Sequence, residues 1–442
     1  MEYAVYLELL VVLIAIFVGA KVGGIGLGIF GMLGMSILVF VFKLPPGNAP
    51  IEVMLMIVAV ITAASALQSA GGLEYLVKVA EKILRRNPGS ITFLGPVVCY
   101  FFTFLAGTGH IAYSLLPIIA EIATDSKVRP ERPMSVSVIA SQQAITASPI
   151  SAATAALLST SLLGGQGIEM IDILMVCIPA TIIGVIAAAF VVNFIGVDLE
   201  KDPVYLKRLQ EGLIKHDERT EVVEEKGHGP LIAVALFLMG VFSVVLFGSI
   251  SSLRPSFMVD GALVQVTMAQ IIQIIMMSTA GLILIFAKAD VTKAVNGSIF
   301  IAGMQAVIAI FGIAWMGDTF FNGNLAFFKD NIQSLVTAYP FLFAFALFVM
   351  SILLFSQAAT VKTLYPLGLA LGIPPMALVA MFPAVNGYFF LPNYPTVVAA
   401  INFDRTGTTR IGKYVINHSF QIPGFVATIV AIGVGYFIIS FM

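Results

Sequence analysis

The sequence predicts an all-α integral membrane protein built as an inverted repeat, and three observations support this fold class. Hydrophobic residues make up 59% of the 442 residues and charged residues only 11%, whereas a soluble domain carries roughly 25% charged residues. The hydrophobic residues form long runs rather than alternating with polar ones, which argues against a membrane β-barrel. Finally, polar breaks containing Gly or Pro interrupt apolar segments at corresponding places in the two halves of the chain.

Ten apolar segments approach or exceed the length of about 20 residues that a membrane-spanning helix needs. They lie approximately at 4–20, 24–42, 51–74, 134–163, 171–196, 230–250, 265–287, 296–318, 374–400 and 415–441. Two further stretches, 90–124 and 340–373, each contain two short apolar arms around a polar tip. We expect each of these two stretches to form a re-entrant hairpin.

The distribution of Lys and Arg agrees with this layout. If each hairpin enters and leaves the membrane on the same side, nearly all Lys and Arg residues fall on a single face of the membrane. The exceptions are Lys43, Arg254 and Lys329 on the other face and Lys362 within a hairpin. Cytoplasmic loops are enriched in Lys and Arg, so both termini are predicted to be periplasmic. If the first hairpin alone crossed fully, every later loop would change sides and the bias would be lost. An arrangement in which both hairpins cross remains an alternative.

The layout divides the chain into two repeats of opposite orientation, each with three spans, a hairpin and two more spans. The first repeat is 1–197, with the hairpin 90–124 and a broken span at 134–163. The second is 230–442, with the hairpin 340–373 and a broken span at 374–400. Residues 198–229 are rich in charge and are predicted to form a cytoplasmic linker.

The two hairpin tips and the two broken spans carry the residues expected to bind a ligand. The predicted binding residues are Thr108, Gly109 and His110; Thr146, Ser148, Pro149 and Ser151; Ser356, Gln357, Thr360 and Lys362; and Asn393, Pro395 and Thr396, with Gln142, Gln143 and Asn386 as further polar groups nearby. Proline prevents a continuous helix, and helix N-termini at such breaks attract anions. Hydroxyl and amide groups add donors without a fixed charge. These features favour a small organic anion, although any single Ser or Thr can instead serve close helix packing.

Three titratable side chains near these breaks have more than one interpretation. Asp318, at the end of the span 296–318, is a candidate for ion coupling because acids within membrane segments are often functional; it is otherwise a helix cap or an interfacial carboxylate. Lys362 is expected to pair with a substrate carboxylate, to pair with Asp318, or to extend to the outer face. His110 is expected to donate to a carboxylate, to titrate near neutral pH, or to face water.

The sequence offers little for other chemistry. The four histidines are scattered, and no nucleophile–base set, metal-ligand spacing or nucleotide-binding loop is present, so neither an enzyme nor an ATP-driven pump is expected. The net charge of −1 gives no nucleic-acid surface. Cys99 and Cys177 both lie in apolar segments and are expected to be free thiols. No cofactor is predicted, and coupling to Na⁺ or H⁺ stays open.

Several long motifs resemble the DcuA/DcuB-type anaerobic C4-dicarboxylate transporters, and the resemblance covers essentially the whole chain. The motifs are AKVGGIG at 20–26, AGTGHIAYSLLPIIAE at 106–121, RPERPMS at 129–135, ITASPISAA at 145–153, AWMGDT at 314–319, LFSQAAT at 354–360 and LPNYPTVVAAINFDRTGTTRIGKYVINHSF at 391–420. The resemblance implies uptake, exchange or efflux of fumarate, succinate, malate and aspartate across the bacterial inner membrane. It also implies a homodimer that works as an elevator-type transporter.

Three other functions remain as alternatives to an exchanger. One is an anion channel, in which the same hairpins would form a fixed pore. Another is an ion-coupled dicarboxylate symporter that also acts as a co-sensor for a histidine kinase, as some members of the resembled family do. The third is a regulatory receptor that contacts a sensor kinase through the linker 198–229.

Overall fold

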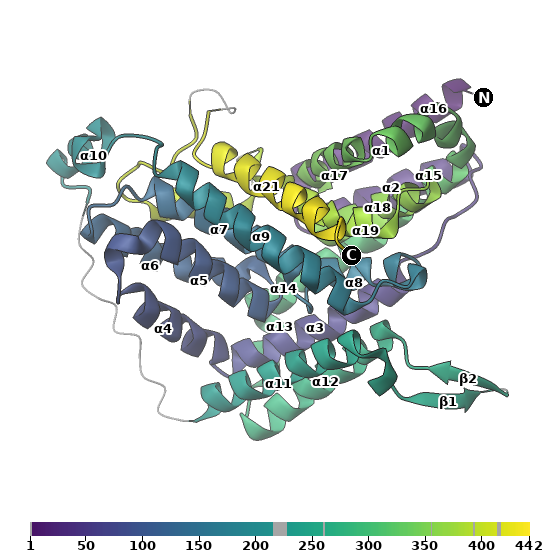
Figure 1. Cartoon of the computed structure of the whole chain (residues 1–442), viewed down its shortest axis with the longest axis horizontal. Coiled ribbons are helices and arrows are strands. Elements are labelled where there is room, and N and C mark those ends of the chain that lie inside the picture. The colour runs from purple at the N-terminus through teal and green to yellow at the C-terminus, as the bar shows by residue number, and fades with distance from the viewer. Residues whose placement is uncertain (1, 215–227, 260, 355, 392–393, 413–416) are drawn as a thin grey trace.

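The computed structural model describes all residues except 1, 215–227, 260, 355, 392–393 and 413–416, and its chain is predominantly helical (Figure 1). The helices of the first half are α1 Glu2–Val22, α2 Gly26–Phe40, α3 Ile51–Ser69, α4 Gly72–Leu84, α5 Ile91–Ala106, α6 Ala112–Asp125, α7 Glu131–Ala147, α8 Ala152–Leu157, α9 Met170–Val192 and α10 Pro203–Gln210. Those of the second half are α11 Gly229–Ser249, α12 Met268–Phe286, α13 Val291–Asn296, α14 Ser298–Ala309, α15 Trp315–Gly323, α16 Leu325–Ala338, α17 Phe341–Leu354, α18 Gln357–Ala370, α19 Pro375–Ala380, α20 Pro395–Phe403 and α21 Gln421–Ile439.

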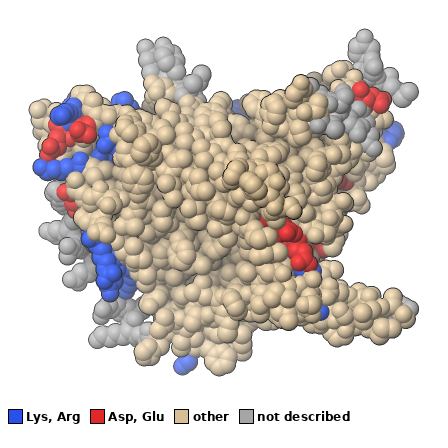
Figure 2. Space-filling view, viewed as in Figure 1, with Lys and Arg blue, Asp and Glu red and all other residues tan. Residues whose placement is uncertain are grey.

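The helices have the lengths and compositions of a multi-pass membrane protein. In the described part of the chain, seven helical segments are long and apolar enough to cross a membrane, and α2, α17 and most of α1 are shorter apolar helices. Figure 2 shows a broad face with few charged atoms, whereas charge gathers at the edge where Figure 1 places α10 and α4. The predicted class, a predominantly α-helical integral membrane protein, is confirmed.

The re-entrant and inverted arrangement stays a prediction. The segment Pro88–Ala106, which includes the first arm of the predicted hairpin 90–124, is itself long and apolar enough to cross a membrane. The second arm, α6, has only 14 residues, which is short of the usual span. By length, the first arm is therefore a candidate span and the second arm is not.

Three elements were not expected from the sequence. Strands β1 Ser256–Val259 and β2 Ala262–Gln265 form an antiparallel hairpin, so the chain is not entirely α-helical. The predicted span 51–74 is two helices, because Gly71 adopts a left-handed conformation (φ 76°) that ends α3 and starts α4. Helix α4 buries Leu76, Ala80 and Leu84 along one face, the spacing of an amphipathic helix. The third element is helix α16, which precedes the predicted hairpin 340–373.

Two groups of helices can be distinguished by their packing. In one group, α7 and α9 pack on each other and respectively against α5 and α21. In the other, α12 packs against α3 and α11, while α2 packs against α1 and α14. A short π-helical segment, Ile310–Ala314, joins α14 to α15 and packs against α2. Such segments weaken the regular hydrogen-bond ladder and frequently occur near functional sites.

Candidate functional site

Two helix starts present their N-termini to a common region, and each has its own side-chain cap. Helix α5 ends at Gly107, which takes a positive φ of 67°, and the Thr108 side chain then accepts a hydrogen bond from the N–H of His110. A single 3₁₀ turn leads from there into α6. At the other start, the hydroxyl of Ser356 accepts from the N–H of Ala359 and so caps α18. Ser and Thr are favoured at such positions because their oxygens satisfy free helix N–H groups.

Both predicted broken spans contain helix interruptions. Helix α7 ends at Ala147 and α8 begins at Ala152, with Ser148 and Ser151 in extended conformations between them. In the second segment, α19 ends at Ala380, short 3₁₀ turns follow, and α20 begins at Pro395. Proline fits the first helical turn because it has no N–H to leave unpaired there.

A cavity of about 640 Å³ lies where these elements meet. The wall that carries the breaks supplies the polar residues Thr108, His110, Ser141, Gln142, Ser356, Gln357 and Thr396, together with Gly109 and Pro395. The facing wall comes from α2, α3 and α14 and is mostly apolar, with Leu27, Ile57, Val60, Ile61, Ala302, Gly303 and Ala306. Among the described lining residues there is no Asp or Glu, and the basic ones are Lys21 and His110. An anion in this cavity meets helix N-termini and uncharged donors without carboxylate repulsion.

A second cavity of about 480 Å³ adjoins the first. The two share the lining residues His110, Tyr113, Ile299, Ala302 and Gln305. The second extends to Gln68 and Ser298. Gln68 and Ser298 are joined by a hydrogen bond of 3.0 Å between Nε2 and Oγ. Together the cavities extend from the polar breaks to Gln68, near the end of α3, and Ser298, at the start of α14.

Beside the main cavity, a chain of amides connects elements from both halves of the protein. Gln357 Nε2 donates to Asn386 Oδ1 (3.1 Å), and Asn386 Nδ2 donates to Gln143 Oε1 (3.3 Å). Gln143 Nε2 in turn donates to Thr428 Oγ1 on α21 (3.1 Å). All four side chains are at least nine-tenths buried. The chain holds the α18 start, the second break and α7 in fixed relation to one another.

Seven of the predicted binding residues line the cavity, and six others that the structure describes do not. Thr108, Gly109, His110, Ser356, Gln357, Pro395 and Thr396 are brought together. Four hydroxyl groups are used within the fold: Thr146 donates to Gln143 O, Ser148 to Phe104 O and Thr360 to Ser356 O, while Ser151 caps α8. Pro149 is buried in the same interruption, and Asn393 lies outside the described residues.

Lys362 and Asp318 are not among the cavity-lining residues. Lys362 Nζ donates to Ser161 Oγ at 2.7 Å, in the loop that follows α8. Asp318 Oδ2 accepts from the N–H of Asn48 at 2.6 Å and from Asn322 Nδ2 at 3.0 Å. The Asp318 carboxylate therefore holds the loop between α2 and α3, and its proposed role in ion coupling stays a prediction.

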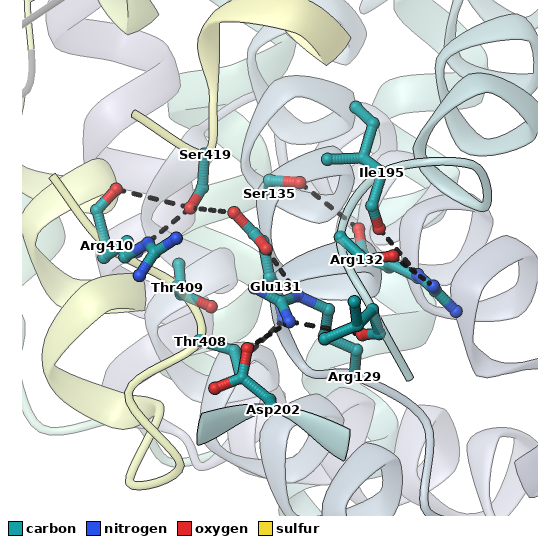
Figure 3. Close-up of polar contacts among 12 residues, drawn as sticks. Arg129, Glu131, Arg132, Ser135, Ile195, Asp202, Thr408, Thr409, Arg410 and Ser419 are labelled. Carbon is teal, nitrogen blue, oxygen red and sulfur yellow. Dashed lines mark hydrogen bonds and ion pairs between the residues drawn. The ribbon is translucent and has the colours of Figure 1, made fainter. Parts of the chain in front are cut away.

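A buried ion network lies apart from this cavity, at the charged edge of the molecule (Figure 3). Arg129, only 3% exposed, donates from Nε to Glu131 Oε2 (2.6 Å) and from Nη1 to Asp202 Oδ2 (2.5 Å). Glu131 also accepts from the Ser419 hydroxyl (2.6 Å), and its N–H donates to Thr408 Oγ1 (3.2 Å). The network ties the α6–α7 loop to the start of the linker and to the segment before α21.

The ion network predicts a loss of stability in acid. Burial alone raises the pKa of the Asp202 carboxyl, but hydrogen bonds from the Tyr205 N–H and from Arg129 outweigh burial, and the pKa lies below its ordinary value. A carboxyl whose pKa is lower in the folded state stabilises fully above about pH 4 and loses this effect as the pH falls through the folded-state pKa. Wild type and Asp202→Asn are expected to differ in unfolding temperature near neutral pH and to converge below about pH 4. A constant difference in thermal unfolding measured across that range would contradict this role.

Sequence reasoning missed two parts of this picture. Arg129 pairs with Asp202 although the two positions are 73 residues apart. No pattern in the local sequence predicts this pair. Tyr113 and Gln305 line the cavity although neither belongs to a recognised break. The His110 and Tyr113 rings stack at 6.0 Å, and their spacing of three residues, one helical turn, is the signal that could have indicated the contact.

Comparison with known proteins supports one family over nearly the whole chain. The sequence model of the DcuA_DcuB family, described as anaerobic C4-dicarboxylate membrane transporter, matches residues 4–442. C4-dicarboxylate transporter DcuA of Escherichia coli strain K12 is 47% identical over 437 residues, covering 98% of this chain and 99% of the relative. DcuA of Wolinella succinogenes is 44% identical over 431 residues, covering 98% of each. Anaerobic C4-dicarboxylate transporter DcuB of Escherichia coli O157:H7 is 40% identical over 437 residues, covering 97% of each.

Among solved structures, Neisseria gonorrhoeae MtrF, from a class of antimetabolite efflux pumps, is similar with a TM-score of 0.48 and 14% identity, covering 90% of this chain and 83% of that chain. The family model and the curated relatives decide the assignment. The chain belongs to the DcuA/DcuB family of anaerobic C4-dicarboxylate membrane transporters and is a transporter rather than an enzyme.

Proposed function

We propose that the protein is a secondary transporter that exchanges C4-dicarboxylates, namely fumarate, succinate, malate and aspartate, across the bacterial inner membrane. The observation that carries this proposal is the cavity of about 640 Å³ at which the starts of α6, α18 and α20 meet. Ligand sites usually occupy roughly 300–1,000 Å³, so the cavity has room for a four-carbon diacid with water. Helix N-termini and hydroxyl donors suit its carboxylates.

The contrast between the two walls of the cavity supports alternating access. Most polar groups belong to the wall built from the breaks, while the facing wall presents mainly small and aliphatic residues such as Ile57, Ile61 and Gly303. Its polar members are Gln305 and Lys21. An apolar wall makes few directional bonds, so the polar wall can slide along it without losing hydrogen bonds. In this proposal an elevator unit carries the two hairpins and the broken spans, and the remaining helices form the static unit and a homodimer contact.

The placement of the charged residues favours exchange over ion-coupled uptake through Asp318. Its carboxylate is held by Asn48 and Asn322 and does not line the cavity. The second cavity extends from His110 to Gln68 and Ser298, on the side predicted to be cytoplasmic. The proposed conformation is therefore open to the cytoplasm.

Cysteine protection tests whether the diacid occupies this cavity. Gln305→Cys places a thiol on the half-buried static wall, where it lines both cavities. Wild type supplies the background, because Cys99 and Cys177 are fully buried. We expect succinate and fumarate to slow maleimide labelling of the variant several-fold, and the monoacid butyrate to have much less effect. Equal labelling with and without the diacids would overturn the assignment of the site.

A further inference from the structure

Gln142 is a buried polar side chain at the cavity whose amide atoms are both unpaired within the described chain. It lies on α7, lines the cavity and is 2% exposed. Within the described chain, neither its Nε2 nor its Oε1 has a hydrogen-bond partner. Its neighbour Gln143 is equally buried and uses both amide atoms, toward Thr428 and Asn386. The difference is therefore specific to the side chain at the cavity wall.

An unpaired buried amide needs an explanation, because more than about 90% of buried polar groups in proteins have a partner. A buried group without a partner destabilises the fold, because it has lost its bonds to water and gained none in return. Thr396, in the first turn of α20, is also buried, lines the same cavity and has an Oγ1 without a partner in the described chain. Unpaired groups also occur elsewhere in the described chain, but these two lie on one cavity wall, where a ligand could supply the missing partners.

The chemistry of Gln142 distinguishes it from Thr396. A primary amide offers two donor hydrogens on nitrogen and an acceptor on oxygen. A carboxylate can accept from Nε2, but it offers nothing to Oε1. An ammonium or hydroxyl group on the carbon next to that carboxylate would donate to Oε1. Because no Asp or Glu is found among the described lining residues, the Gln142 oxygen is a suitable acceptor for such a group.

We propose that Gln142 is a specificity-determining residue that binds the amino or hydroxyl group on carbon 2 of the diacid, while its Nε2 binds the adjacent carboxylate. This inference rests on the proposed dicarboxylate exchange. Aspartate and malate carry the group on carbon 2, whereas fumarate and succinate lack it. A site that hydrogen-bonds a substrate N–H or O–H discriminates against analogues without it, because the protein group is then left unpaired.

Competition in proteoliposomes tests the proposal with the full-length protein. The vesicles contain unlabelled succinate, and entry of labelled fumarate is inhibited by external L-aspartate, L-malate or succinate. In Gln142→Met, an unbranched apolar side chain replaces the amide. We expect the half-inhibitory concentration of aspartate or malate to rise about 5–10-fold relative to that of succinate, the factor for one hydrogen bond of about 1–1.4 kcal/mol. Thr396→Val, which removes an ordinary donor, should weaken all three competitors by similar factors.

A second variant, Gln142→Glu, keeps the test informative if Gln142→Met does not fold. Gln142→Glu keeps an acceptor but loses the donor, so it is expected to weaken every diacid while raising the preference for aspartate, with its ammonium group, over succinate. If wild type is active and both variants keep the wild-type ratio of half-inhibitory concentrations for aspartate and succinate, the proposed role of Gln142 is wrong. The proposed exchange function would be unaffected by that result. A wild type that exchanges no diacid would overturn the proposed function, and with it this inference.

Discussion

Replacing Arg129 by methionine is expected to lower the free energy of unfolding by about 3–5 kcal/mol, the usual cost of breaking a buried ion pair by removing one partner. The guanidinium is 3% exposed and lies between Glu131 and Asp202. Without it, two largely buried carboxylates face each other without a counter-charge. The expected measurement is a clear drop in unfolding temperature in detergent, together with reduced yield of monodisperse protein.

A nearby ion pair provides the matched control for Arg129. Lys127 pairs with Glu200 at 2.6 Å, but the two side chains are 73% and 60% exposed. Water and salt screen such a pair, so Lys127→Ala should leave the unfolding temperature almost unchanged. Arg129→Lys should fall between wild type and the methionine variant, because lysine keeps the charge and loses the planar fork. Equal effects of Lys127→Ala and Arg129→Met would contradict the importance of burial.

The second large effect is expected for Gly312→Ala. Gly312 lies in the π-helical segment, and an added Cβ would overlap the carbonyl oxygen of Gly28 on α2. Gly28 in turn faces the backbone of Ile308. Because the colliding atoms belong to backbones, they cannot rotate away. Overpacking commonly lowers the free energy of unfolding by about 1–3 kcal/mol and occasionally by more. For Gly312→Ala we expect a loss at the upper end of this range. Transport should also fall, since α2 and α14 form part of the cavity wall.

Gly281→Ala is the matched control for this prediction. Gly281 lies in the interior of α12, and no heavy atom lies within 4 Å of the added Cβ. Alanine in an open helix position stabilises by roughly 0.5–1 kcal/mol relative to glycine. Its unfolding temperature should equal or exceed that of wild type. Similar unfolding temperatures for Gly281→Ala and Gly312→Ala would contradict the close backbone contact between α2 and the π-helical segment.

Apolar run length made most membrane helices predictable. The segments predicted at 171–196 and 230–250 correspond to α9 Met170–Val192 and α11 Gly229–Ser249. A long apolar run in lipid forms a continuous helix because the helix satisfies all of its backbone hydrogen bonds internally. The boundary between α3 and α4 was missed, since it depends on a single left-handed glycine inside a continuous apolar stretch. The strand hairpin was also missed, although its Asp260-Gly261 pair is a strong turn signal.

For the site, the sequence located the breaks but not the direction of each side chain. Thr108 and Ser356 cap helices at the cavity, as their positions before helix starts suggest. Ser148 is equally polar and equally close to a break, yet it bonds to Phe104 O on α5. Such choices depend on which helix packs alongside, and that contact is set by tertiary structure. For the same reason the unpaired state of Gln142 could not be distinguished from the paired state of Gln143.

Counterflow in proteoliposomes tests the central claim most directly. Vesicles containing the purified protein are loaded with unlabelled succinate, and the entry of labelled fumarate is followed with and without Na⁺ and pH gradients. For an exchanger we expect rapid entry of labelled fumarate that requires internal succinate and does not respond to the Na⁺ or the pH gradient. Entry into empty vesicles at the same rate, without stimulation by internal succinate, would contradict an exchanger and indicate a channel or an ion-coupled carrier.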